Sequence, residues 1–277
     1  MAKLSAPKKT RSIKRVLVSI LYHDLTIDLI RLLDKIKIGK KDDLFIIFDN
    51  INNNSLNLIL KKKYKNIKLF FGYRKIKKVP YYRNIALKKA IPNYEILLFL
   101  DSDILPCKNI IDKHYKSHKK YKEIPLIAGS VKPSFLIKKK TFWEKIDGCM
   151  SWFCSLEPKK NMTVKYPYHL ATANISMKIN FMKNYNIKFD NNLITGEDVD
   201  LCNKIRRLKR DIMIVKNIQV VHKDRIQLNS FLEHQKHWAK HHYYLRYKNN
   251  FFLKKKQHLF YLLFFIFYPL LSPFISL

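Results

Sequence analysis

Two aspartates, Asp101 and Asp103, follow the most hydrophobic of the predicted strands, at residues 96–100. A run this continuously apolar predicts a strand buried on both faces, and open α/β sheets bind ligands at the carboxyl ends of such strands. Two carboxylates so close together repel each other and raise each other's pKa, and a divalent cation removes the repulsion. The structural alternative is a turn or a helix N-cap before Pro106.

A second acidic group lies at the start of a later helical pattern. Thr195 and Asp198 have the spacing of a capping box, which predicts that a helix begins here with Glu197, Asp198 and Asp200 in its first turn. The helix dipole stabilises ionised carboxylates at this position. Asp198 is thereby a candidate for contact with a substrate hydroxyl, although an acidic helix start is also an ordinary structural feature.

A histidine, His222, directly follows a short apolar run at residues 219–221. A single histidine is most often a structural residue. Together with Asp101 and Asp103 it becomes a candidate metal ligand. The late histidines His234 and His237 lie on a predicted helix, where solvent exposure explains them better than a zinc site.

Strands and helices alternate in the first part of the chain. The apolar patterns predict strands at residues 16–21, 44–48, 67–71 and 95–100, with helices at 25–36, 54–62 and 82–90 between them. Interleaving at this spacing predicts parallel βαβ units with helices on both faces of the sheet.

The rhythm changes beyond residue 101. We expect a helix at 106–120, strands at 125–131, 170–177, 212–215 and 219–221, and helices from 195 and over 230–247. His114 and His118 lie four residues apart on the Lys-rich first of these helices and are predicted to be at the surface.

Residues 138–168 lack periodicity, as functional loops often do. Trp143 and Trp152 in this segment are candidates for a lid or acceptor wall, or for core packing.

Composition excludes several classes of protein. The chain has 277 residues and a formal net charge of +34, with 47% hydrophobic residues, which is too apolar for a disordered basic tail. The five glycines form no Gly-rich phosphate loop, so dinucleotide-binding and Walker-type folds are excluded. The lysines are dispersed, which argues for compositional bias and against a specific nucleic-acid partner. The four cysteines form no CxxC pair, and we expect reduced thiols.

The two ends of the chain differ in character. Residues 1–13 form a basic tail without the apolar segment of a signal peptide. Residues 259–277 contain no charge and would span about 28 Å as a helix, close to the ~30 Å membrane core. Pro269 and Pro273 make an in-plane segment an alternative, and a buried core helix is another. Flanking lysines predict attachment to the cytoplasmic face of a membrane through residues 249–277.

The order of these motifs over residues 14–246 resembles the family-2 glycosyltransferases, whose GT-A fold joins a nucleotide-sugar-binding half to an acceptor-side half. The matching segments are Ile20-Leu21-Tyr22-His23, Phe48-Asp49-Asn50, Tyr82-Arg83-Asn84, FLDSDILP, Ala173-Asn174 and GEDVDLCNKIRR. Three segments depart from the family pattern: Leu21, Ala171-Thr172-Ala173 and Gln235-Lys236-His237-Trp238. The last of these argues against a processive polymerase.

The resemblance implies a role for each matched residue. Asp103 and His222, with Asp101, would bind Mn²⁺ or Mg²⁺. Asp198 would be the general base and Glu197 would orient the site. The donor would be bound by Tyr22, Asp49, Arg83, Asn84, Asp101 and Ser102. The acceptor side would hold Asn174, with Trp143 and Trp152.

The sequence therefore predicts a metal-dependent inverting glycosyltransferase with an α/β GT-A fold, a nucleoside-diphosphate sugar donor and a glycan, lipid-linked or protein acceptor. We expect three segments: a basic tail at 1–13, a catalytic domain at 14–248 and a membrane-associating segment at 249–277. The catalytic domain would consist of a nucleotide-binding half at 14–106 and an acceptor half at 107–248. The alternatives are a membrane-tethered nucleotide-sugar-binding protein without turnover, a basic nucleic-acid-binding protein and a metal-dependent nucleotidyltransferase.

Overall fold

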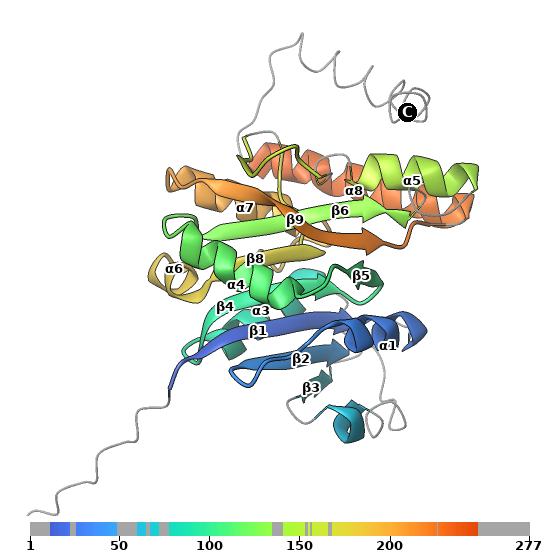
Figure 1. The fold of residues 1–277 in the computed structure, drawn as a ribbon. Helices are drawn as coiled ribbons and strands as arrows, with labels where there is room; N and C mark the ends of the chain where they lie inside the picture. The colour runs from blue at the N-terminus through green and yellow to red at the C-terminus, as the bar shows by residue number, and fades with distance from the viewer. Residues whose placement is uncertain are drawn as a thin grey trace, which may run out of the picture.

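Helices cover both faces of one nine-stranded mixed sheet (Figure 1). In this computed structural model the described residues are 12–22, 26–48, 60–64, 67–71, 78–134, 141–152, 155, 157–165, 168–225 and 227–248. The strand order is β3-β2-β1-β4-β8-β6-β9-β5, and β7 pairs with β9 outside this path. This confirms the predicted α/β class and the helices on both faces of the sheet.

The amino-terminal half of the sheet is parallel. Its strands are β1 (Lys14–Tyr22), β2 (Asp42–Phe48), β3 (Ile67–Phe71) and β4 (Tyr94–Asp101), and its helices include α1 (Thr26–Lys35) and α3 (Val79–Ala90). Each neighbouring pair of these strands runs in the same direction, as the βαβ pattern predicts. The helix predicted at residues 54–62 lies mostly outside the described residues.

The carboxyl-terminal half of the sheet is mixed. Its strands are β5 (Ile104–Pro106), β6 (Leu126–Pro133), β7 (Met162–Thr163), β8 (Asn174–Lys178) and β9 (Ile212–His222). Its helices are α4 (Ile110–Lys120), α5 (Phe142–Trp152), α6 (Ile179–Asn184), α7 (Glu197–Arg207) and α8 (Leu228–Lys248). Strand β8 is antiparallel to both β4 and β6, so one continuous sheet runs through both predicted halves.

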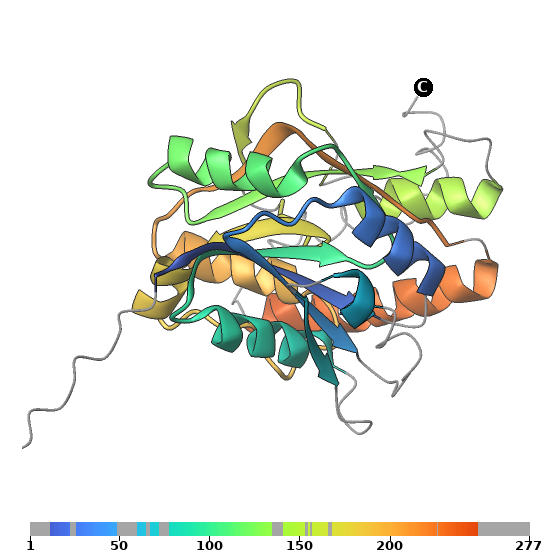
Figure 2. The ribbon, with the colours of Figure 1, turned by 60° about the horizontal axis from the view of Figure 1, so that its bottom comes forward.

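Strand β4 lies in the middle of the core and is buried on both faces. Ile96, Leu98 and Leu100 belong to the hydrophobic cluster that includes residues of α1 and α4. Leu97 and Phe99 belong to the cluster that includes residues of α3, α6 and α7. Figure 2 shows these helices on opposite faces of the sheet. The continuous apolar run before Asp101 is thus explained by burial on two sides.

Two predictions for the second half were wrong. Residues 138–168 were expected to lack regular structure, but they contain the helix α5. This helix starts with a capping box, in which the Thr141 N–H donates to Glu144 Oε2 at 2.9 Å and the Glu144 N–H donates to Thr141 Oγ1 at 3.3 Å. The two short strands expected at 212–221 are one strand, β9, with a register shift against β6 and a left-handed Asn217 at φ 68°.

The histidines of α4 are buried, although a Lys-rich helix predicted them at the surface. His114 Nδ1 lies 2.8 Å from Ser176 Oγ, and His118 Nε2 lies 2.9 Å from the same oxygen. Burial lowers the pKa of His114 to about 4 and that of His118 to about 3. Both imidazoles are therefore neutral groups that attach α4 to strand β8 of the sheet.

Residues 1–11 of the predicted basic tail and the apolar segment at 259–277 lie outside the described residues. Among the residues that are described, no helix combines the length and the hydropathy required to cross a membrane.

Candidate active site

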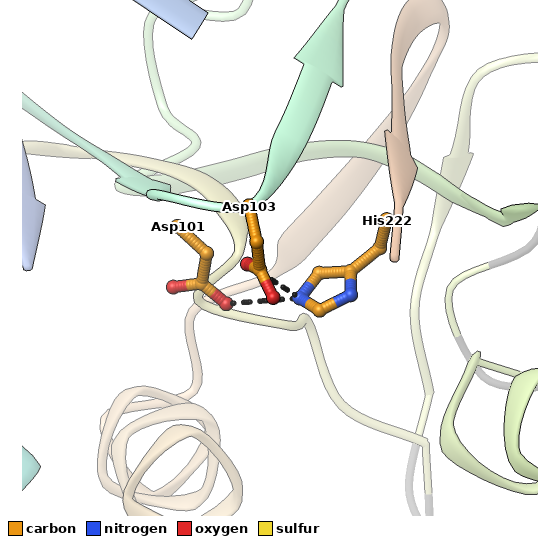
Figure 3. Close-up of side chains that lie close together, drawn as sticks. All are labelled: Asp101, Asp103 and His222. Carbon is orange, nitrogen blue, oxygen red and sulfur yellow. Dashed lines mark ion pairs between the residues drawn. The ribbon is translucent and has the colours of Figure 1, made fainter. Parts of the chain in front are cut away.

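The three predicted metal ligands lie together at the carboxyl end of β4. The chain turns through Ser102 and Asp103 into β5, which pairs with β9 so that Ile104 stands opposite His222. His222 Nε2 consequently lies 3.2 Å from Asp103 Oδ1 and 3.6 Å from Asp101 Oδ2 (Figure 3). The strand register, rather than nearness in sequence, places the imidazole beside the acid pair.

This group of side chains fits a divalent cation. One ligand atom from each of Asp101, Asp103 and His222 lies within 4.8 Å of the others. Two carboxylate oxygens and one imidazole nitrogen suit Mn²⁺, and carboxylates also suit Mg²⁺. Burial lowers the pKa of His222, but the carboxylates of Asp103 and Asp101 outweigh burial and raise this pKa to about 9. The imidazole is therefore protonated when no cation is bound, and its positive charge balances the two carboxylates. A cation at this position would take the place of that proton.

Arg83 of α3 connects the acid pair to α7. Its guanidinium forms a short contact with Glu197 Oε1, and its Nη2 lies 3.7 Å from Asp101 Oδ1. The residue is only 7% exposed, and its Cζ lies 5.9 Å from the ring centroids of both Phe99 and Phe189. Because two carboxylates engage its charge, Arg83 is a bridge within the site, and the direct phosphate contact stays a prediction.

Helix α7 begins differently from the prediction. Its N-cap is Gly196 at φ 76°, and no side chain caps the helix, so the capping box expected from Thr195 does not form. A left-handed backbone favours glycine, and a Cβ on Gly196 would lie 2.6 Å from Leu245 Cδ1 of α8. This glycine therefore permits both the sharp entry into α7 and the close packing of α8.

The acidic residues of α7 point in two directions. Glu197 contacts Arg83, whereas Asp200 is buried against Lys204 at 2.8 Å on its own helix. Burial, together with the neighbouring carboxylate of Asp198, raises the pKa of Glu197, and Arg83 opposes this shift. Asp200 is therefore a structural residue, while Glu197 joins the site.

Asp198 lies at the mouth of α7 with its side chain 15% exposed. Its Oδ1 accepts a hydrogen bond from the Val199 N–H at 2.8 Å, and its Oδ2 lies 3.9 Å from His169 Nε2. Burial raises the pKa of Asp198 in spite of the Arg83 charge, which makes the carboxylate a stronger proton acceptor. A carboxylate in this state can act as a general base.

Sequence reasoning missed His169. Burial lowers its pKa to about 4, so a neutral imidazole stands beside Asp198. Its ring centroid lies 6.4 Å from that of Trp238 in α8. In the sequence it is a single histidine directly before a predicted strand, and it has no regular spacing to another candidate residue that would indicate a role in the site.

The two tryptophans predicted on the acceptor side have different environments. Trp152, at the end of α5, places its ring centroid 4.4 Å from that of His222. Trp143 packs against Phe142 and Phe231 instead. Of the two, only Trp152 borders the metal ligands.

Two predicted contacts with substrate are corrected by burial and by internal hydrogen bonds. Tyr22 is 2% exposed, with its ring edge-on to Phe48 and its hydroxyl 2.6 Å from Thr26 Oγ1, so it has no face for a nucleobase. Asn174 is 0% exposed, and its buried amide forms hydrogen bonds with His114 and with two main-chain carbonyls. Both residues belong to the core.

Asn84 was predicted to bind the donor, but its side chain holds a loop in place. The amide exchanges hydrogen bonds with the main chain of Phe189 at 2.9 Å in both directions and donates to Asn191 Oδ1 at 2.8 Å. Ser102 is buried in the turn between the two aspartates. Asp49 lies outside the described residues.

The mixed sheet with helices on both faces, and with an acid pair at the end of its central strand, is a GT-A type α/β fold. No family model and no curated protein sequence matches the chain.

Two solved structures share this fold. GalNAc-T7 with UDP, GalNAc and Mn²⁺ superposes with a TM-score of 0.57 at 16% identity over 79% of this chain and 45% of that one. A mannosyltransferase, PcManGT from Pyrobaculum calidifontis, with GDP-Man and Mn²⁺, gives 0.55 at 13% identity over 76% of this chain and 57% of that one. The protein thus spans about half the length of these two enzymes.

Proposed function

We propose that the protein is a metal-dependent glycosyltransferase that moves a sugar from a nucleoside diphosphate to a hydroxyl acceptor. The observation that carries the proposal is the position of Arg83, which lies between Asp101 and Glu197 and so links the metal ligands to the start of α7, next to Asp198. The two enzymes of similar fold were solved with nucleotides and Mn²⁺, which agrees with this assignment.

The residues divide the reaction between them. Asp101, Asp103 and His222 would hold Mn²⁺ or Mg²⁺, which when bound supplies positive charge to the leaving diphosphate. Asp198 would accept the acceptor's proton as the new oxygen–carbon bond forms and the bond from the sugar to the diphosphate breaks. Attack opposite the leaving group makes this a single displacement with inversion. Glu197, held by Arg83, would fix the start of α7.

The acceptor that we propose is a hydroxyl of a cell-envelope or lipid-linked glycan. The net charge of +34 supports this choice, because it attracts the protein to anionic surfaces. Membrane attachment through residues 249–277 stays a prediction about a segment outside the described residues.

Calorimetric titration with UDP and GDP, with and without Mn²⁺, tests the proposed function. We expect one of these nucleotides to bind only when Mn²⁺ is present, and the matching nucleotide sugar to be turned over. NMR of the product anomer then decides between inversion and retention. Absence of Mn²⁺-dependent binding to both nucleotides would contradict the proposal for these two bases, and a screen of further nucleoside diphosphates would complete the test.

A further inference from the structure

Arg83 is paired inside the site, so a different cationic side chain would have to add to the charge that a bound metal supplies to the donor phosphates. The guanidinium of Arg83 is shared between Glu197 and Asp101, and the residue is almost completely buried. A departing nucleoside diphosphate adds negative charge to a site that already holds two aspartates. A second positively charged side chain at the rim would stabilise this leaving group.

Lys223 lies at this rim. It follows His222 directly, and its main-chain N–H donates to the carbonyl oxygen of Asp103 at 3.3 Å, so its backbone is fixed to the turn that carries the acid pair. Its side chain is 47% exposed, and Nζ lies 3.0 Å from Asp28 Oδ2 at the start of α1. The backbone of Lys223 therefore adjoins the metal ligands, while its ammonium group pairs with Asp28 and is accessible to solvent.

The partner of Lys223 also belongs to this neighbourhood. Asp28 lies in the first turn of α1, and α1 packs against β5, the strand that directly follows the acid pair. Asp28 has a second cationic neighbour, because Arg31 Nη1 lies 3.6 Å from its Oδ1. Asp28 would consequently keep a counter-charge if Lys223 moved away.

We propose that Lys223 binds the diphosphate of the nucleotide donor, exchanging its ion pair with Asp28 for one with the phosphate oxygens. This rests on the proposed function, and it assigns a phosphate contact to a residue that belongs to no sequence motif. A lysine ammonium is a compact point charge with three donors on a flexible stem, and such a group can follow a phosphate from the bound to the departing state. The exposed Lys223–Asp28 pair is weak, so its exchange costs little.

The test is calorimetric titration of the full chain with UDP and GDP in the presence of Mn²⁺. Lys223→Ala is expected to weaken nucleoside diphosphate binding about tenfold, as loss of one charged contact does. Binding of uridine or guanosine, which lack the phosphates, should not change. Lys223→Arg should restore most of the affinity because it keeps the charge. Asp28→Asn should leave the affinity equal or raise it, because Lys223 then has no competing partner.

Lys119→Ala is the matched control, since Lys119 is also an exposed lysine in an ion pair, with Glu95 at 2.7 Å, and it lies on α4 away from the acid pair. The control should bind like the wild type. If Lys223→Ala binds the diphosphate within twofold of the control, the assignment of Lys223 is wrong while the proposed function stands. If the wild-type protein itself binds neither nucleotide with Mn²⁺, the proposed function and the Lys223 contact are both contradicted for these two bases.

Discussion

Arg83 and Glu197 form a buried ion pair although 114 residues of sequence separate them. The pair joins α3, which packs beneath the parallel half of the sheet, to α7, which follows the antiparallel strand β8. Since Arg83 also approaches Asp101, one guanidinium links the end of the central strand to the start of the acidic helix. Both the stability of the protein and the shape of its site depend on this link.

Replacing Arg83 by alanine should lower the free energy of unfolding by about 3–5 kcal/mol, because it leaves the buried carboxylate of Glu197 without its counter-charge. Urea denaturation measures this loss. Arg31→Ala is the control, because Arg31 forms a surface contact with Asp28 and should change stability by about 0.5 kcal/mol or less. Similar small changes for both variants would show that the buried pair contributes little.

Asp103→Asn and His222→Ala should each abolish the rise in melting temperature that Mn²⁺ causes in the wild-type protein, because each removes one of the three clustered ligands. Asp211→Asn provides the comparison, since this exposed aspartate pairs with Lys165 and should leave the metal response intact. A metal response that survives in both ligand variants would place the cation elsewhere.

Asp198→Asn should reduce sugar transfer by about 10²–10⁴-fold, because an amide cannot accept the proton of the acceptor hydroxyl. Affinity for the nucleoside diphosphate with Mn²⁺ should stay near that of the wild type, since Asp198 is not among the clustered metal ligands. The two quantities are measured on the same preparation by product analysis and calorimetry. Near-normal transfer by the folded variant would rule out Asp198 as the base.

Stability should fall as the pH drops below about 6.5, partly because of His114 and His118. Their folded-state pKa values are about 4 and about 3, so between pH 6.5 and 4 the unfolded chain binds protons that the folded protein does not. The stabilisation is present above pH 6.5 and is lost as the pH falls toward the folded-state pKa. Each histidine contributes a slope of up to about 1.4 kcal/mol per pH unit.

His118→Gln removes one of these titrating groups, so its stability should decline less steeply than that of the wild type over this range. Urea denaturation at intervals from pH 7 to pH 4 gives both slopes, and the slope is independent of any constant loss from the substitution. Parallel curves for the two proteins would mean that His118 is not held neutral by burial.

Cys202 should resist alkylation in the native protein. Burial raises the pKa of its thiol to about 12, and the side chain has no exposed surface. Mass spectrometry after iodoacetamide treatment should find Cys202 modified only in denaturant, whereas the partly exposed Cys107 reacts in the native state. Rapid native modification of Cys202 would indicate frequent opening of α7.

Local patterns predicted most of the strands and helices correctly. The parallel half follows directly from its hydrophobic periodicity, because strands buried on two faces and amphipathic helices have different repeats. The errors occur where tertiary packing overrides composition. The Lys-rich α4 hides two histidines against β8, and the N-cap of α7 is Gly196, a left-handed residue against which Leu245 of α8 packs closely, and not Thr195.

The sequence by itself determined the alternation of strands and helices, the acid pair at the end of the central strand and the acidic start of α7, because each depends on residues close together in the chain. Only the tertiary structure decided which side chains meet. His222 reaches Asp103 through the pairing of β5 with β9, Arg83 is committed to Glu197, and Lys223 is held by Asp28. Such contacts depend on strand register and on long-range packing, which no local spacing of residues encodes.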